Sequence, residues 1–270
     1  MSGINCSVAG ATYAAAVAAN AAVAFDGTGD YYQAAGPLTT TATDSKYLTI
    51  AFTWFHPTGG NSRNQHFMTA HLGTVSGENG WEVCIQSGRF RYSSWDNSGS
   101  NTDIIYGDFA ATENAWNQMV AYVDHTLFSN CKYYLNGVDR TANLLNGAAF
   151  GEISLANLNI NWGATNASIK IGVKDASAQY ATAFSDFLGS IAQIYAHNAV
   201  GAPTISNYWN TTSSRPKDLG TTGVTTGLVR PLIYHYGTTA TFGVNNGTGF
   251  NAYTLTGNGN VVSAIGPTYG

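Results

Sequence analysis

The stretch WNQMVAYVDHTLFSNCKYYLNG, residues 116–137, decides the fold. Apolar and polar residues alternate up to Val123, a short polar break follows, and a second run ends in Asn136-Gly137. A period of two is typical of a β-strand with one buried face, and Asn-Gly is a strong signal for a tight turn. The stretch therefore predicts a β-hairpin. Asp124 and His125 are neighbours in a strand, so we expect them on opposite faces at the hairpin rim, not as an acid–base pair.

Similar short runs recur through the chain, at 47–55, 80–88, 89–96, 169–173 and 187–198, with turn residues between them. The composition agrees, because 10% of the 270 residues are charged while 31 are Gly and 16 are Tyr. Such a pattern favours strands and turns over helices. Successive strands without intervening helices predict an all-β, antiparallel two-sheet sandwich. We place Trp54 and Trp116 in its core.

Charge and hydropathy exclude several classes of partner. The net charge is −4 and the Lys and Arg residues are scattered singly, so neither nucleic acid nor a membrane surface is an expected partner. No run of 18 apolar residues is present that could span a bilayer. The Ala-rich residues 1–21 lack the basic start of a signal peptide, so we interpret them as an N-terminal arm. Three widely spaced cysteines give no disulfide framework.

Five motifs in order resemble the laminin-G-like, concanavalin-A-like jelly-roll family. They are AVAFDGTGDYYQ at 22–33, YLTIAFTWFHP at 47–57, the stretch 113–139 with its Trp and Tyr-Leu-Asn-Gly, IKIGV at 169–173 and FLGSIAQIYAHNAV at 187–200. The resemblance implies a jelly-roll sandwich over residues 22–200. Residues 201–270 then form a helix or loop and a C-terminal β extension. We expect residues 224–270 to pack on the sandwich or on a neighbouring subunit as an appended element, so that their loss impairs assembly more than folding.

The C-terminal part also resembles the tails that follow such jelly rolls in tailed-phage virion proteins. Its RPLIYHYGTTATFGVNNGTGFNAYTLTGN, with Asn245, Asn246, Gly247, Gly249 and Phe250, carries that likeness. The resemblance implies a non-enzymatic virion protein that decorates or cements a capsid or belongs to a head or tail fibre. It would be made in the host bacterial cytoplasm, contact other virion proteins and assemble as a homo-oligomer, for example a trimer. The alternative is a carbohydrate-binding module that recognises bacterial surface glycans.

Motifs for enzyme chemistry are weak, and we expect no catalytic site. Glycoside hydrolysis commonly uses two carboxylates, but Glu78 and Glu82 are separated by a Gly-containing turn. No G-x-S-x-G motif accompanies Asp124 and His125. The six His include no H-E-x-x-H motif and the cysteines stand far from one another, so zinc is not expected either.

Two short segments are candidates for binding. In DGTGDYY, Asp26 and Asp30 flank two Gly and could bind calcium, although we favour an Asx turn that caps backbone N–H groups. In RYSSWDN, Tyr92, Trp95, Asp96 and Asn97 offer rings for sugar C–H groups and polar atoms for hydroxyls. The alternative for Tyr92 and Trp95 is a core role, since they differ in strand parity and one should point inward. No other cofactor is expected.

Overall fold

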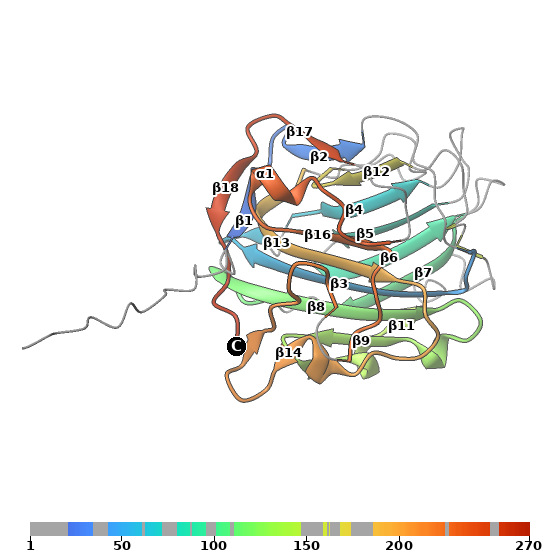
Figure 1. The fold of residues 1–270 in the computed structure, drawn as a ribbon. Helices are drawn as coiled ribbons and strands as arrows, with labels where there is room; N and C mark the ends of the chain where they lie inside the picture. Colours follow the sequence, from blue (N-terminus) through green and yellow to red (C-terminus); the bar gives the residue numbers. More distant parts are fainter. Residues whose placement is uncertain are drawn as a thin grey trace, which may run out of the picture.

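The computed structural model describes residues 21–34, 43–60, 63–71, 80–86, 88–95, 101–108, 111–146, 159–160, 162, 168–173, 186–224, 227–248 and 254–270. It contains two large antiparallel sheets that face each other (Figure 1). This confirms the all-β sandwich that the alternating runs predict. The expected N-terminal arm lies outside the described residues, except for Ala21 at the start of the first strand.

The first sheet, called sheet A, has eight strands. In spatial order they are β10 (Val138–Asp139), β9 (Lys132–Leu135), β8 (Ala115–Asp124), β3 (Tyr47–His56), β13 (Leu188–His197), β1 (Ala21–Asp26) and β18 (Val262–Ile265), with β16 (Ile233–Tyr236) also pairing with β13. The long central strands β3 and β8 pair from Tyr47 opposite Asp124 to His56 opposite Ala115.

The second sheet, sheet B, also has eight strands. In spatial order they are β11 (Leu145–Asn146), β7 (Asn101–Asp108), β6 (Arg89–Trp95), β5 (Gly80–Gln86), β4 (Gln65–His71), β12 (Ser168–Ile171), β2 (Tyr31–Ala34) and β17 (Leu255–Asn258). A small hairpin, β14 (Trp209–Asn210) with β15 (Arg215–Pro216), stands apart from both sheets. The short helices are η2 (Phe128–Asn130), η3 (Thr141–Asn143), η5 (Ile205–Asn207) and α1 (Thr239–Phe242).

The main core lies between the sheets. Alternate residues of each long strand point into it. Leu48, Ile50, Phe52 and Trp54 of β3 are buried in it, as the alternation predicts. Trp116 is an exception: it is half-buried and packs edge-to-face on Phe55. The core-facing residues of β8 are Met119, Ala121 and Val123, so an even-numbered Trp points away from the core. Our assignment of Trp116 to the core was therefore wrong.

The C-terminal extension contributes strands to both sheets. β16 and β18 join sheet A beside β13 and β1, while β17 joins sheet B beside β2. In Figure 1 the red segment with β17 and β18 runs along the same side of the molecule as the blue strands β1 and β2. Phe242 and Leu255 of this segment are buried in the main core. Three strands of the extension are thus hydrogen-bonded members of the two sheets.

A second, smaller apolar cluster covers the outer face of sheet A. Tyr195 of β13 packs edge-to-face with Tyr208 and Tyr234, and Leu219 completes the buried group with Ala51 and Val120. The chain after β13 therefore folds back over the sheet it has just left. At one end of this covered face, Tyr47 at the start of β3 is half-buried, and one of the candidate sites lies beside it.

Candidate functional sites

The residues predicted to bind a glycan on β6 are not gathered at the surface. Tyr92 is fully buried in the main core, and its hydroxyl lies 2.9 Å from Nε2 of His125. Trp95 lies on the other face of the sheet and is also buried; it packs over Gly80, where an added Cβ would come within 2.4 Å of the indole. Asp96 and Asn97 lie outside the described residues. Tyr92 therefore has a packing role, as the parity argument allowed.

The two aspartates that are candidates for calcium binding cap backbone N–H groups. Asp26 Oδ1 accepts a hydrogen bond from the Thr28 amide at 2.7 Å, which is the Asx turn favoured from the sequence. Asp30 is fully buried, and its two oxygens accept from the amides of Asp26 at 2.7 Å and of Asn260 at 2.5 Å. Asp30 thereby links the turn to the C-terminal extension. Calcium binding here stays a prediction.

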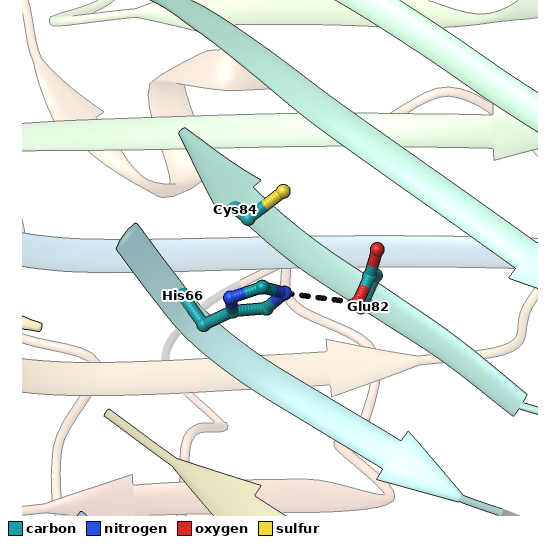
Figure 2. A group of neighbouring side chains, drawn as sticks. All are labelled: His66, Glu82 and Cys84. Carbon is teal, nitrogen blue, oxygen red and sulfur yellow. Dashed lines mark hydrogen bonds and ion pairs between the residues drawn. The ribbon is translucent and has the colours of Figure 1, made fainter. Parts of the chain in front are cut away.

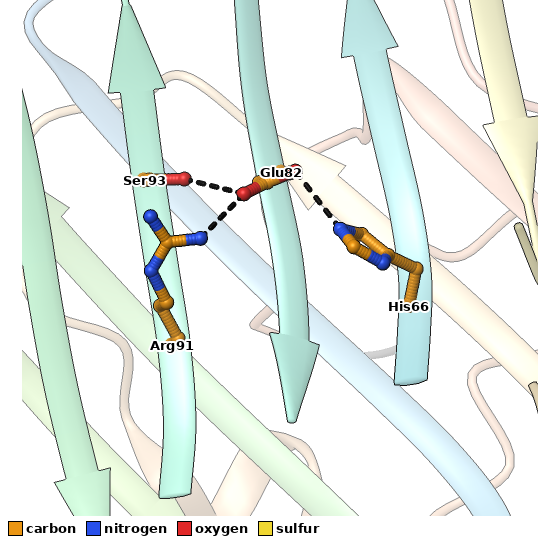
Figure 3. Close-up of polar contacts among 4 residues, drawn as sticks. All are labelled: His66, Glu82, Arg91 and Ser93. Carbon is orange, nitrogen blue, oxygen red and sulfur yellow. Dashed lines mark hydrogen bonds and ion pairs between the residues drawn. The ribbon is translucent and has the colours of Figure 1, made fainter. Parts of the chain in front are cut away.

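A charged cluster lies on the outer face of sheet B. His66, Glu82, Arg91 and Ser93 converge from three adjacent strands, β4, β5 and β6 (Figure 3). Glu82 Oε2 lies 2.9 Å from His66 Nε2, while Oε1 accepts from Arg91 Nη1 at 2.6 Å and from the Ser93 hydroxyl at 2.9 Å. All four side chains are buried. The cluster cross-links three strands through one carboxylate.

The electrostatics of this charged cluster keep Glu82 ionised. Burial alone would raise the pKa of Glu82, but the hydrogen bond and charge of His66, the charge of Arg91 and the Ser93 hydroxyl together hold it well below its usual range. Glu82 is the residue weighed above as half of a catalytic pair with Glu78, which lies outside the described residues. Its two oxygens are engaged within the sheet. Cys84, two residues along β5, projects to the same side as Glu82 (Figure 2).

A solvent-accessible hollow of about 390 Å³ lies on the outer face of sheet A, where β3 begins and β8 ends. We call it the tyrosine hollow. Its principal lining side chains are Tyr47, Tyr122, Asp124, Thr126, Asn130 and Lys132, and the segment 200–202 closes one side. The rings of Tyr47 and Tyr122 are parallel within 3°, with centroids 6.4 Å apart. An aromatic pair thus lies beside carboxylate, hydroxyl, amide and ammonium groups.

The polar side of the tyrosine hollow is held by Asp124. Its Oδ1 accepts from the Thr126 amide at 2.8 Å and hydroxyl at 2.5 Å, and Oδ2 accepts from Asn130 Nδ2 at 2.8 Å. Burial opposes ionisation, but these hydrogen bonds outweigh it and lower the pKa of Asp124. On the aromatic side, the Tyr122 hydroxyl accepts from the Gly201 amide at 3.1 Å. Both sides of the hollow are therefore anchored to backbone.

Asp124 and His125 separate as strand geometry predicts, although both are buried and not at an open rim. Asp124 faces the tyrosine hollow, and His125 turns inward to Tyr92. Sequence reasoning missed the hollow because its lining comes from β3, β8, the turn after β8, β9 and the segment after β13. Tyr47 and Tyr122 are far apart in the sequence, and only the β3–β8 register places them as diagonal neighbours on one face.

Comparison with known proteins supports the fold of the chain but does not assign the chain to a family. No family model matches the chain, and no curated protein matches its sequence. Among solved structures, a heptameric SAP-like pentraxin from Limulus polyphemus is similar over 92% of this chain and 96% of its own, with a TM-score of 0.51 and 13% identity. Domains LG4-5 of the mouse laminin α1 chain match over 68% of this chain and 43% of theirs, with a TM-score of 0.43 and 13% identity.

A further similar structure is the CBM40 of Ruminococcus gnavus IT-sialidase bound to α2,3-sialyllactose. It covers 63% of this chain and 92% of its own, with a TM-score of 0.40 and 14% identity. The likeness to the pentraxin supports the jelly-roll sandwich that the sequence resemblance implies. Nothing links the chain to phage virion proteins, so the virion role, its partners and its location stay predictions. No helix in the described part of the chain is long and apolar enough to cross a membrane.

Proposed function

We propose that this chain is a non-catalytic carbohydrate-binding module whose sugar site is the tyrosine hollow. The single observation that carries the proposal is the Tyr47–Tyr122 pair set beside Asp124, Asn130 and Lys132 in one accessible hollow. The fold alone could not carry it, because one fold hosts many functions.

The lining fits the two kinds of surface that a sugar presents. A pyranose has C–H faces that pack on an aromatic ring and a rim of hydroxyls that donate and accept hydrogen bonds. Tyr47 is half-buried, so part of its ring remains open to the hollow, while Thr126 and Asn130 are exposed at the polar side. The hollow is within the range of about 300–1,000 Å³ that small-molecule sites occupy. We therefore place the sugar ring against Tyr47, with its hydroxyls toward Asn130 and Lys132.

A binding role suits this lining better than hydrolysis. Glycosidases commonly place two carboxyl groups on either side of the scissile bond. Among the described residues that line the tyrosine hollow, Asp124 is the one acidic residue. Its oxygens already accept three hydrogen bonds from Thr126 and Asn130. A second carboxyl group is missing from this described lining.

A glycan array with the full chain tests the proposal, followed by calorimetric titration of the best ligand. Tyr47→Ala should weaken that ligand by at least about tenfold, equivalent to about 1.4 kcal/mol. Tyr31→Ala is the matched control, since Tyr31 is a half-buried tyrosine at the start of β2, outside the hollow. The proposal fails if no glycan is retained, or if Tyr47→Ala binds like the wild type. Release of reducing ends from the bound glycan would instead show an enzyme.

A further inference from the structure

We propose that His66, Glu82 and Cys84 form a binding site for a divalent metal ion of borderline softness, with Zn²⁺ as the best fit. One ligand atom from each residue lies within 4.8 Å of the others, and all three residues are buried (Figure 2). An imidazole nitrogen, a carboxylate oxygen and a thiolate sulfur are a donor set that Zn²⁺ accepts in tetrahedral sites. This inference is independent of the proposed glycan site, which lies on sheet A.

The register of sheet B creates this grouping. Cys84 is the direct partner of His66 across the β4–β5 ladder, and Glu82 is two residues along β5 on the same face. An irregularity between His66 and Met68 inserts one extra residue into β4. Phe67 and Met68 both enter the core, so His66 points outward next to Glu82 and Cys84. Bulges commonly re-aim a side chain in this way at functional sites.

The carboxylate is held as a metal ligand requires. Arg91 and Ser93 both donate to Oε1 of Glu82, which leaves Oε2 directed at His66 (Figure 3). Outer hydrogen-bond partners of this kind fix the orientation of a ligand carboxylate. Tetrahedral coordination with bonds of about 2 Å would set Nε2 and Oε2 slightly more than 3 Å apart. The observed separation is 2.9 Å, so a small opening of the pair admits the ion.

The proton balance of binding is simple. Neutral His66 moves its single ring proton from Nε2, where it faces Glu82 Oε2, to Nδ1, and Zn²⁺ binds between the freed Nε2 and Oε2. The thiol of Cys84 gives up its proton to solvent and binds as thiolate. The charges of Zn²⁺, the thiolate, Glu82 and Arg91 then sum to one positive charge, against zero before binding. Three protein ligands leave the fourth tetrahedral position to water.

Metal analysis of the full chain tests the site. Because buried metal sites load with folding, the protein should be refolded with Zn²⁺ or Co²⁺, gel-filtered and measured by mass spectrometry for bound metal. We expect one equivalent in the wild type and, with Co²⁺, a thiolate charge-transfer band in the near ultraviolet. Cys84→Ser should abolish the band and weaken Zn²⁺ by at least about tenfold. Cys131→Ser, which removes the other described buried cysteine, should leave both unchanged.

If Cys84→Ser fails to fold, X-ray absorption of the wild-type zinc complex tests the site without a variant. It identifies the atoms bound to the zinc ion. We expect the zinc ion to be bound by one sulfur atom together with nitrogen and oxygen atoms. The proposal is overturned if the refolded wild type retains less than half an equivalent, if no sulfur atom is bound to the zinc ion, or if the band survives in Cys84→Ser. His66, Glu82 and Arg91 would then form a hydrogen-bonded ion-pair network alone.

Discussion

Tyr92 on β6 of sheet B and His125, directly after β8 of sheet A, share a hydrogen bond of 2.9 Å across the sandwich core. Both side chains are buried, so neither end of this bond can exchange its partner for water. We expect Tyr92→Phe to lower the free energy of unfolding by about 1–3 kcal/mol, since it removes one partner and leaves a polar atom of His125 in the core. Urea unfolding monitored by circular dichroism measures this directly. Tyr31→Phe, at a half-buried site on β2, should stay within about 0.5 kcal/mol of the wild type. Equal stability of Tyr92→Phe and wild type would show that the bond contributes nothing net.

The charged cluster on sheet B predicts a large cost for removing a single partner. Arg91→Met leaves Glu82 buried without its guanidinium, and we expect a loss of about 3–5 kcal/mol. The surface ion pair between Arg140 and Asp108, at 3.2 Å and partly exposed, is the matched comparison. There, Arg140→Met should cost at most about 1 kcal/mol. If both substitutions cost the same, burial does not strengthen the Glu82–Arg91 pair.

Acid should destabilise the fold in two steps. Burial lowers the pKa of His197 and of His235 from 6.5 to about 4 in each case. The unfolded chain binds protons at these sites first, so stability is full above pH 6.5 and is lost as the pH falls toward 4, by up to about 3 kcal/mol per histidine. Unfolding curves at pH 7, 6 and 5 should show the decline. His235→Gln should flatten it, and a slope that does not change would refute the assignment.

The second step is the protonation of Glu82 below pH 4.5. Its pKa is depressed from the ordinary 4.5, so its contribution to stability is present above pH 4.5 and disappears as the pH falls toward the lowered value. In Glu82→Gln the loss of stability below pH 4.5 should be shallower than in the wild type, although the variant is less stable at pH 7. The pH dependence of the unfolding midpoint separates this step from the histidine step. Parallel curves for Glu82→Gln and wild type below pH 4.5 would exclude Glu82 as the titrating group.

The sequence predicts the framework well because alternation and turn residues are local. Leu48 to Trp54 show their buried face directly, and Asn136 and Gly137 adopt the positive φ angles, 52° and 74°, of a tight turn. Trp116 lies outside the core because its parity is opposite to that of Met119, Ala121 and Val123. Strands β16, β17 and β18 are four residues each, too short for a pattern to show which sheet they join.

The candidate sites depend on relationships that no local pattern contains. His66 and Glu82 are 16 residues apart and meet only through the β4–β5 register. The extra residue at Phe67 reverses the face on which His66 would otherwise lie, and alternation alone cannot place such a bulge. Tyr47, Asn130 and the segment 200–202 meet at the tyrosine hollow because β3, β8 and β13 are neighbours in sheet A. Both sites therefore depend on strand order and register, which the local sequence pattern does not contain.

The C-terminal extension should be essential for folding, in contrast to the appended element expected from the sequence. Deleting 224–270 removes β16, β17 and β18, and with them the partners of parts of β13, β2 and β1. We expect the truncated chain to lose cooperative thermal unfolding. A point substitution gives a graded test: Phe242 is fully buried and packs on Tyr32 at 5.3 Å between ring centroids, so Phe242→Ala should cost about 3–5 kcal/mol. Ile265→Ala, at a side chain that is 85% exposed, should change stability by less than about 0.5 kcal/mol. A truncated chain that unfolds at the wild-type temperature would restore the view of residues 224–270 as an appendage.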